Sequence, residues 1–282
     1  MKNSTVLIVI GKDASRSELA AQLETLRKIS ARAAIIVLGD MPPFPYYASG
    51  LTLYGTTEVP AEWQHSVAAE RAALEAKGEE MEALLQAHDV PGDVSTVMCE
   101  ASRIADCIAP RAMLADIALI SEELREVEPI FRQAVYGVLF QSPIGVLLND
   151  AAAATLDGPK RIFVAWNSHL SSARAVHLAR PLLRQAEEII IGTVDPVTTG
   201  EGEDPGVDVA TWLSHMGCKV TVQQYPSGGQ PVGKCILDRA RDAGSELIVM
   251  GSYGRSRTRE ALFGGTTRSL IEQRVQPVFL AH

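Results

Sequence analysis

A short apolar segment that ends at glycine is the most informative feature of the sequence: ELIVMGSYG at residues 246–254, followed by GGTT at residues 264–267. The apolar run over 247–250 predicts a buried strand, because it is short and stops abruptly at glycine. The spacing of apolar residues over 266–274 predicts a helix. The segment therefore predicts a strand, a glycine-bearing loop and the N-terminus of a helix.

This arrangement favours the binding of an anion. The first backbone N–H groups of a helix have no intrahelical partner and carry a partial positive charge. Glycine has no side chain, so the backbone can approach phosphate oxygens closely. The alternative is that the glycines form only a tight turn before a helix. Arginines add positive charge around the loop: Arg255, Arg257, Arg259 and Arg268.

The glycine spacing G-x2-G-x9-G, with hydroxyl residues after it, resembles the nucleotide loop of ATP-binding universal stress proteins. In that family the glycines surround the ribose and phosphates of ATP, and a Ser or Thr after the third glycine contacts phosphate. Gly265 stands at that position here. The resemblance therefore implies that Thr266 or Thr267 supplies the hydroxyl group, or that the backbone alone contacts phosphate. It also assigns to the nucleotide site Met250, Gly251, Gly254, Arg255 and Gly264.

The same resemblance implies two further walls of the site, at the ends of two other strands of this half. One strand ends at Ala165, Trp166 and Asn167. ATP-binding members often have Asp at the position of Asn167, and Asn can also donate and accept hydrogen bonds. Val194 ends the other strand and matches the family's valine on the adenine side. Trp166 is expected either to wall the pocket or to belong to the core.

The two halves of the sequence can be laid over each other. At an offset of 155 residues, Val6–Ile10 falls on Arg161–Ala165. Near the ends of the halves the offset is 130, and Ala115–Ile120 falls on Ser245–Met250. This pattern predicts duplication of a unit of about 130 to 150 residues rather than a short-period solenoid.

Apolar runs alternate with helical patterns in both halves, which predicts parallel sheets covered by helices on both faces. We therefore expect an α/β protein of two tandem doubly wound domains with flavodoxin-like layering, 1–150 and 159–282, joined by a linker at 149–160. The resemblance implies the adenine nucleotide alpha hydrolase-like form of this fold. Such sheets bind ligands beyond the carboxyl ends of their strands, where strand order reverses. Strands are predicted at 5–10, 34–39, 93–99, 116–121, 143–148, 161–166, 188–194, 218–224, 246–251 and 277–281.

The first half lacks the features of the nucleotide loop. It has SEEL at 121–124 where the second half has GSYG, and Arg132 and Gln133 where the second half has Gly264 and Gly265. Carboxylates beside a triphosphate would repel it, so we predict a degenerate domain without nucleotide. Four glutamates lie in this segment: Glu122, Glu123, Glu126 and Glu128. We expect them to form the solvent-exposed start of a helix, and a metal site is the alternative.

The composition predicts a globular protein of the cytoplasm. Hydrophobic residues make up 46% and charged residues 21% of the chain, which is typical of a protein with a substantial core. The net charge of −8 argues against general binding of nucleic acid or acidic membranes. No apolar stretch suits a signal peptide or a membrane span. The four cysteines have no metal-site spacing and fit a reducing compartment.

We expect a stress-response sensor or regulator that binds ATP, ADP or AMP, with or without magnesium, together with protein partners that the sequence does not identify. No paired base and nucleophile is found, so slow hydrolysis of ATP is the most that we expect. Two alternatives stay open. One is a scaffold that binds no nucleotide, favoured by Asn167 and Gly265. The other is an enzyme of the ATP-pyrophosphatase type, suggested by SGGQ at 227–230, although an Asp-Ser end is missing and a turn is the simpler interpretation.

The last strands of the two halves are expected to pair with each other. Single-domain members of the family commonly dimerise through these strands, and both Ile144–Leu148 and Val278–Ala281 are unsuited to an exposed edge. We therefore expect an internal pseudo-twofold pair, and a further homodimer is left open. The insertion at 42–60 is expected to form a lid or a partner surface, or to pack its aromatic residues on the helix predicted at 60–88.

Overall fold

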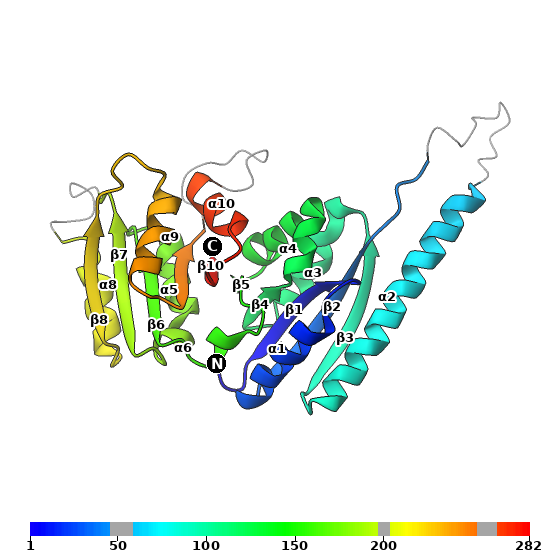
Figure 1. Cartoon of the computed structure of the whole chain (residues 1–282), viewed down its shortest axis with the longest axis horizontal. Coiled ribbons are helices and arrows are strands. Elements are labelled where there is room, and N and C mark those ends of the chain that lie inside the picture. The colour runs from blue at the N-terminus through cyan, green and yellow to red at the C-terminus, as the bar shows by residue number, and fades with distance from the viewer. Residues whose placement is uncertain (46–58, 197–203, 253–263) are drawn as a thin grey trace.

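The computed structural model describes residues 1–45, 59–196, 204–252 and 264–282. Within these ranges, ten strands form one continuous sheet in the order β3-β2-β1-β4-β5-β10-β9-β6-β7-β8 (Figure 1). The strands of the first half are β1 (Thr5–Gly11), β2 (Arg32–Asp40), β3 (Gly92–Cys99), β4 (Ile117–Ile120) and β5 (Gly145–Leu148). Those of the second half are β6 (Arg161–Ala165), β7 (Glu188–Val194), β8 (Val220–Tyr225), β9 (Leu247–Gly251) and β10 (Val278–Ala281).

Helices cover both faces of the sheet. One core layer lies under α1 (Arg16–Lys28), α2 (Ala61–Ala87), α5 (Leu170–Leu178), α6 (Arg180–Leu183) and α8 (Val207–His215). The other lies under α3 (Ile104–Ala112), α4 (Glu128–Gln141), α9 (Val232–Asp242) and α10 (Gly265–Glu272). Each layer runs through both halves. Short 3-10 helices are η1 (Ala101–Arg103), η2 (Glu122–Glu126) and η3 (Ala154–Asp157).

Strand β1 explains why the apolar runs are continuous rather than alternating. Val6, Ile8 and Ile10 point into one core layer, and Leu7 and Val9 point into the other. All five are fully buried. A strand covered on both faces needs apolar residues at every position, so the expected α/β fold is confirmed.

The two halves are joined by an antiparallel pair of strands. β5 and β10 pair with Val278 opposite Leu148 and Leu280 opposite Val146, whereas every other neighbouring pair in the sheet is parallel. The expected pairing of the last strands is therefore present within this one chain. At this seam the Phe279 ring covers Gly145, where an added Cβ would lie 2.2 Å from the ring atom Cζ.

The segment expected to be a linker is packed into the core. Leu156 and Ala153 are fully buried. The hydroxyl group of Thr25 in α1 donates to the Ala152 carbonyl oxygen at 2.8 Å. The amino group of Met1 donates to the Leu156 carbonyl oxygen at 2.5 Å. The connection between the halves is thus a structural element rather than a loose tether.

The start of the 42–60 insertion packs on α2, which is one of the three arrangements that we expected for this insertion. The rings of Phe44 and Trp63 meet edge to face with centroids 5.2 Å apart. The indole N–H of Trp63 donates to the Pro42 carbonyl oxygen at 2.9 Å. The remaining aromatic residues of the insertion lie outside the described residues, so the lid and the partner surface stay predictions.

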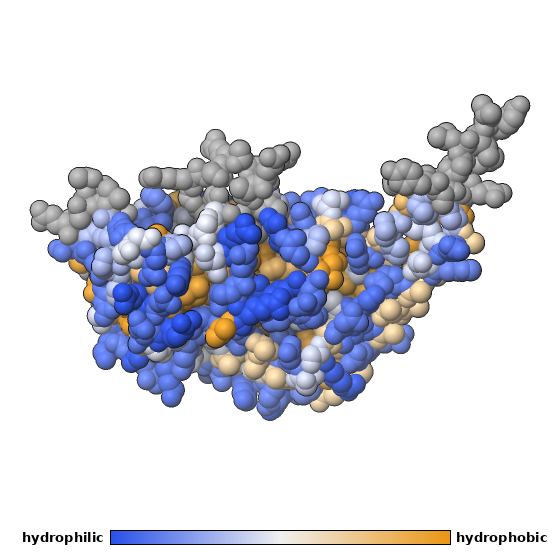
Figure 2. Space-filling model, turned by 45° about the horizontal axis from the view of Figure 1, so that its top comes forward, coloured by the Kyte–Doolittle hydropathy of each residue, from blue (hydrophilic) through white to orange (hydrophobic). Residues whose placement is uncertain are grey.

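The face of the molecule seen in Figure 2 is mostly hydrophilic, with apolar residues visible in small patches between polar ones. Among the helices of the described ranges, none combines the length and the apolar character needed to cross a membrane.

Candidate functional site

A cavity of about 340 Å³ lies at the carboxyl ends of β6, β7 and β9. This is the point where strand order reverses in the second half, because β7 and β9 lie on opposite sides of β6. All ten predicted site residues that the structure describes line it. They are Ala165, Trp166, Asn167, Val194, Met250, Gly251, Gly264, Gly265, Thr266 and Thr267. The two other predicted residues, Gly254 and Arg255, lie outside the described residues.

The first wall of the cavity is formed by the residues that follow β6. The backbone N–H of Trp166 donates to the Gly192 carbonyl oxygen at 2.9 Å, which extends the pairing with β7 by one residue. Trp166 is half-buried, lines the cavity and packs against the core, so it serves both expected roles. The side chain of Asn167 accepts a hydrogen bond from the Ser172 hydroxyl group at 2.5 Å. Its amide NH2 group has no hydrogen-bond partner within the described ranges and can act as a donor.

The N-terminus of α5 forms part of the cavity, and the sequence analysis missed it. Ser171 and Ser172 line the cavity beside Gly251. A Cβ on Gly251 would come within 2.4 Å of the Ser171 carbonyl carbon and of the Ser172 nitrogen. Glycine at this position therefore lets α5 approach the end of β9. Two serines after a strand resemble any polar helix start, so no signal in the sequence singled them out.

An apolar wall comes from β7 and α9. Val194 is half-buried at the end of β7, and Val232 and Ile236 project from α9. Gly192 lies under the Phe163 ring, where an added Cβ would be 2.1 Å from the ring atom Cζ. Val194 was predictable from the family resemblance, whereas the other lining residues of this wall were not. Apolar residues at a helix start look the same whether they face a core or a cavity.

Helix α10 closes the cavity with its N-terminus. Gly264 is the N-cap residue, and as a glycine it brings no side chain to satisfy the first N–H groups of the helix. A Cβ on Gly265 would meet no atom of the described residues within 4 Å. Arg268 was expected to add positive charge here, but its exposed guanidinium is paired with Glu272 at 2.5 Å, and this hydrogen bond raises the pKa of Arg268. Together, α5, α9 and α10 all begin at the cavity, so their positive ends converge on it.

The corresponding crevice of the first half is filled by the chain itself. Glu123 accepts a hydrogen bond from the Gly11 backbone N–H at 3.0 Å and another from the Ser121 hydroxyl group. Leu124 is 4% exposed, and its Cδ2 atom would lie 3.2 Å from a Cβ on Gly11. In the sequence alignment of the halves, Leu124 falls on Gly254 and Gly11 falls on Trp166. Side chains therefore fill the crevice of the first half, whereas the described residues of the second half line a cavity of about 340 Å³.

The expected solvated helix start is wrong for two of the four glutamates. Glu123 points into the crevice, and Glu122 pairs with the buried Arg125 at 2.7 Å. Glu126 and Glu128 are exposed, as expected. Within the described ranges, no group of three or more His, Cys, Asp or Glu side chains could hold a metal ion.

The SGGQ segment at 227–230 forms a turn between β8 and α9, as its interpretation as a turn predicted. Gly228 and Gly229 both have positive φ, which favours glycine. The backbone N–H of Ser227 donates to the Asp195 carboxylate at 2.9 Å, and the bonds from Ser227 lower the pKa of Asp195. The segment does not line the cavity.

No protein-family model matches the sequence, and neither does any curated protein. Solved structures do match. A universal stress protein from Archaeoglobus fulgidus DSM 4304 superposes with a TM-score of 0.64 and 15% identity over 98% of this chain and 95% of that one. A functionally unknown protein from Pseudomonas aeruginosa PAO1 gives a TM-score of 0.49 and 14% identity over 99% and 92% of the two chains. The chain therefore has the fold of the universal stress proteins.

Proposed function

We propose that the protein is a universal stress protein that binds ATP or a related adenine nucleotide in the cavity of its second half. Nucleotide binding would make it a sensor or regulator in the stress response. One observation carries the proposal. Four separate stretches that the resemblance assigned to a nucleotide site, at 165–167, 194, 250–251 and 264–267, line one cavity.

The cavity suits the phosphates of a nucleotide on the side of α10. Helix N-termini bind anions through unpaired N–H groups and a partial positive charge. The open space beside Gly265 allows phosphate oxygens to approach the backbone. Thr266 and Thr267 lie in the same turn, and the half-buried Thr266 is the better placed of the two to offer a hydroxyl group, because Thr267 is only 3% exposed.

The apolar wall of the cavity suits a base. Val194, Val232 and Ile236 supply an apolar surface for a flat ring. The amide NH2 of Asn167, which has no hydrogen-bond partner among the described residues, supplies a donor at its edge. The volume of about 340 Å³ is within the range of sites for ligands of this size.

Among the described lining residues there is no Asp, Glu, His or Lys. Magnesium would therefore be held by the nucleotide phosphates, with no carboxylate from these residues to bind it. A general base for water is also missing from the described lining, which supports binding with slow hydrolysis at most.

The proposal is tested by calorimetry of the full chain with Mg-ATP, for which we expect one site per chain. Two variants of one residue form a matched pair. Gly265→Asp adds a negative charge where the phosphates bind, and this charge is favourable at a helix N-terminus. Gly265→Ala adds only a methyl group in open space.

We expect Gly265→Asp to weaken ATP binding by about tenfold or more without lowering the melting temperature, because like charges repel in a partly dry site. Gly265→Ala should weaken ATP binding less than Gly265→Asp does, since a methyl group takes up part of the space beside the backbone but adds no charge. Two equivalent sites per chain, or equal affinities of the two variants, would contradict the proposal.

A further inference from the structure

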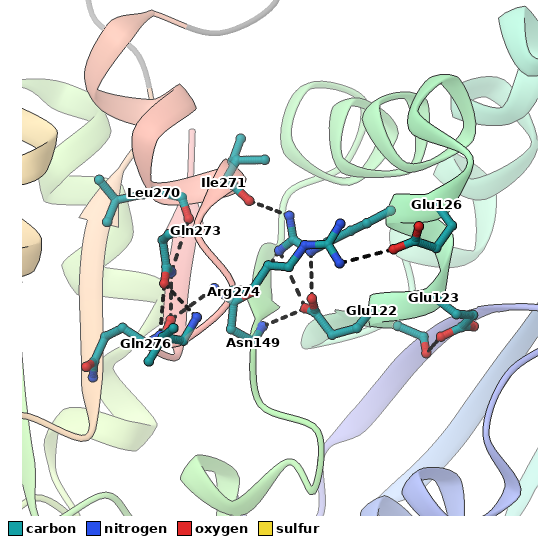
Figure 3. A network of polar contacts seen from close by, with 12 residues as sticks. Glu122, Glu123, Glu126, Asn149, Leu270, Ile271, Gln273, Arg274 and Gln276 are labelled. Carbon is teal, nitrogen blue, oxygen red and sulfur yellow. Dashed lines mark hydrogen bonds and ion pairs between the residues drawn. The ribbon is translucent and has the colours of Figure 1, made fainter.

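The loop of the first half that replaces a nucleotide loop reaches across the seam to α10 of the second half (Figure 3). Its central residue is Arg125. Nη1 of Arg125 donates to the Ile271 carbonyl oxygen, and Nη2 donates to Oδ1 of Asn149 at 2.7 Å. Nε donates to the Glu122 carboxylate at 2.7 Å.

The guanidinium of Arg125 is held on every side. Its side chain is 5% exposed, and it stacks over the Phe131 ring at 4.2 Å from the ring centroid. A buried cation without a partner is costly, so the carboxylate of Glu122 is needed beside it. Glu122 is itself fixed, because it accepts a hydrogen bond from the Asn149 backbone N–H at 3.2 Å.

Other contacts hold the turn that follows α10. The side chain of Asn149 donates to the Gln276 carbonyl oxygen at 3.0 Å. Oε1 of Gln273 accepts the backbone N–H groups of Val275 and Gln276, both at 2.9 Å. The C-terminal end of α10 is therefore bound to the first half through Arg125 directly and through Asn149 one turn later.

The position of Ile271 gives this contact its importance. It lies in the last turn of α10, whose final carbonyl groups lack intrahelical partners and attract cations. Eight residues make a helix about 12 Å long. At the other end of this short rod, 264–267 line the cavity. A shift of the C-terminal end would therefore move the N–H groups that face the cavity.

On its own half, α10 is held mainly by α9. Gly233 of α9 lies so close that a Cβ on it would be 2.7 Å from Cβ of Ser269. Thr267, Leu270 and Ile271 of α10 are also packed into the core, each at most 4% exposed. The hydrogen bond from Arg125 to the Ile271 carbonyl oxygen adds a fixed point at the C-terminal end of the helix, on the side that faces the other half.

We infer that Arg125, neutralised by Glu122, is a positioning residue for the anion-binding end of α10 in the other half of the chain. This inference rests on the proposed function, because it assigns the phosphates to α10. The degenerate loop of the first half thus completes the site of the second half instead of binding a ligand of its own.

The test uses the full chain and four variants. Arg125→Met removes the cation, and the double variant Arg125→Met with Glu122→Gln also removes the charge left behind, which protects folding. Arg125→Lys is the conservative rescue. The matched control is Arg274→Met, which removes an arginine from the same seam. The side chain of Arg274 is 56% exposed, and its guanidinium pairs with the exposed Glu126 at 3.1 Å.

Each variant is measured for affinity to ATP and to adenosine, and for amide hydrogen exchange at 270–272. In the double variant we expect ATP affinity to fall about tenfold, adenosine affinity to stay within about twofold, and exchange in α10 to increase. Arg125→Lys should recover part of the ATP affinity, and Arg274→Met should match the native chain in all three measurements.

Comparing the loss of ATP affinity with the loss of adenosine affinity separates two effects. Misplacement of α10 should weaken only ATP binding, whereas a general destabilisation of the cavity should weaken both. Equal losses of both affinities, or unchanged ATP affinity in the double variant, would overturn the inference. A native chain that binds no ATP would refute the proposed function instead. Hydrogen exchange then still decides whether Arg125 positions α10, because unchanged exchange in Arg125→Met would refute that as well.

Discussion

Gly251 lies directly against the first turn of α5, where a Cβ on it would come within 2.4 Å of the carbonyl carbon of Ser171. The contacted atoms belong to the backbone, so they cannot move aside as a flexible side chain can. This glycine has a packing role in addition to lining the cavity. Gly265, in contrast, borders open space. Gly251 at the end of β9 and Gly265 at the start of α10 thus serve two different purposes.

This difference predicts opposite outcomes for one substitution. Gly251→Ala should lower stability by about 1–3 kcal/mol, since it overpacks a buried contact, and should weaken ATP binding by displacing α5. Gly265→Ala should leave stability almost unchanged, because no described atom lies within 4 Å of the added methyl group. Thermal unfolding and calorimetry of the two variants check this, and a fully stable Gly251→Ala chain would contradict the role assigned to the contact.

A second prediction concerns the seam. Gly145→Val should destabilise the chain by about 1–3 kcal/mol or more, because its side chain would overlap the Phe279 ring. Adding Phe279→Leu should recover part of the loss, since it shortens the overlapping side chain. The Leu280 carbonyl oxygen, 2.8 Å from the same Cβ position, prevents full recovery. Denaturant unfolding of the single and double variants measures the coupling, and purely additive effects would show that the two residues do not interact.

A third prediction concerns acid stability. Burial alone would raise the pKa of Asp93, but hydrogen bonds and charges from Arg111 and Arg32 outweigh it and hold this pKa below its usual value. A lowered native pKa means that the ionised carboxyl stabilises the fold above the unfolded pKa and that this stabilisation is lost as the pH falls through the native pKa.

Asp93→Asn should therefore melt below the native chain at pH 7, by a margin that stays constant down to about pH 5 and shrinks below about pH 4. Melting temperatures of both chains across this range check the sign. A margin that widens in acid would mean that the pKa of Asp93 is raised instead.

The filled crevice of the first half gives a fourth prediction. Leu124→Ala should cost about 2–5 kcal/mol, because a buried leucine leaves a cavity. It should not create a second nucleotide site, since Glu123 still occupies the Gly11 N–H. Restoring glycine at Arg132 and Gln133 should fail for the same reason. Calorimetry should give one ATP per chain in each case, and a second equivalent would overturn the assignment of a single site.

The elements of the fold could be predicted because burial on both faces leaves a clear mark on a sequence. A strand such as β1 must be apolar at every position, and its length and flanking residues separate it from a helix. The pairing of β5 with β10 was also predictable, because an apolar last strand needs a partner. The connection at 149–160 was not, since small residues such as Ala153 pack into a core without forming a recognisable apolar pattern.

The site was predictable where glycine spacing and the family resemblance supplied the residues, as at 250–251 and 264–267. It was not predictable where packing decides direction. Nothing in the sequence shows that Glu123 turns inward to the Gly11 N–H while Glu126 stays in solvent. Arg125 was missed because its partners are distant in the chain: Asn149 is 24 residues away in the same half. Ile271 becomes a neighbour only when the two halves meet.

The antiparallel pairing of β5 with β10 has a consequence for how the sequences of the two halves can evolve. Separate chains that meet through their last strands can exchange partners, and every copy must keep a surface that fits all the others. When the two halves are joined in one polypeptide, β5 always pairs with the same β10. Either side can then diverge without losing its match, so one crevice can fill with leucine and glutamate while the other stays open. The asymmetry becomes a permanent property of a single gene product.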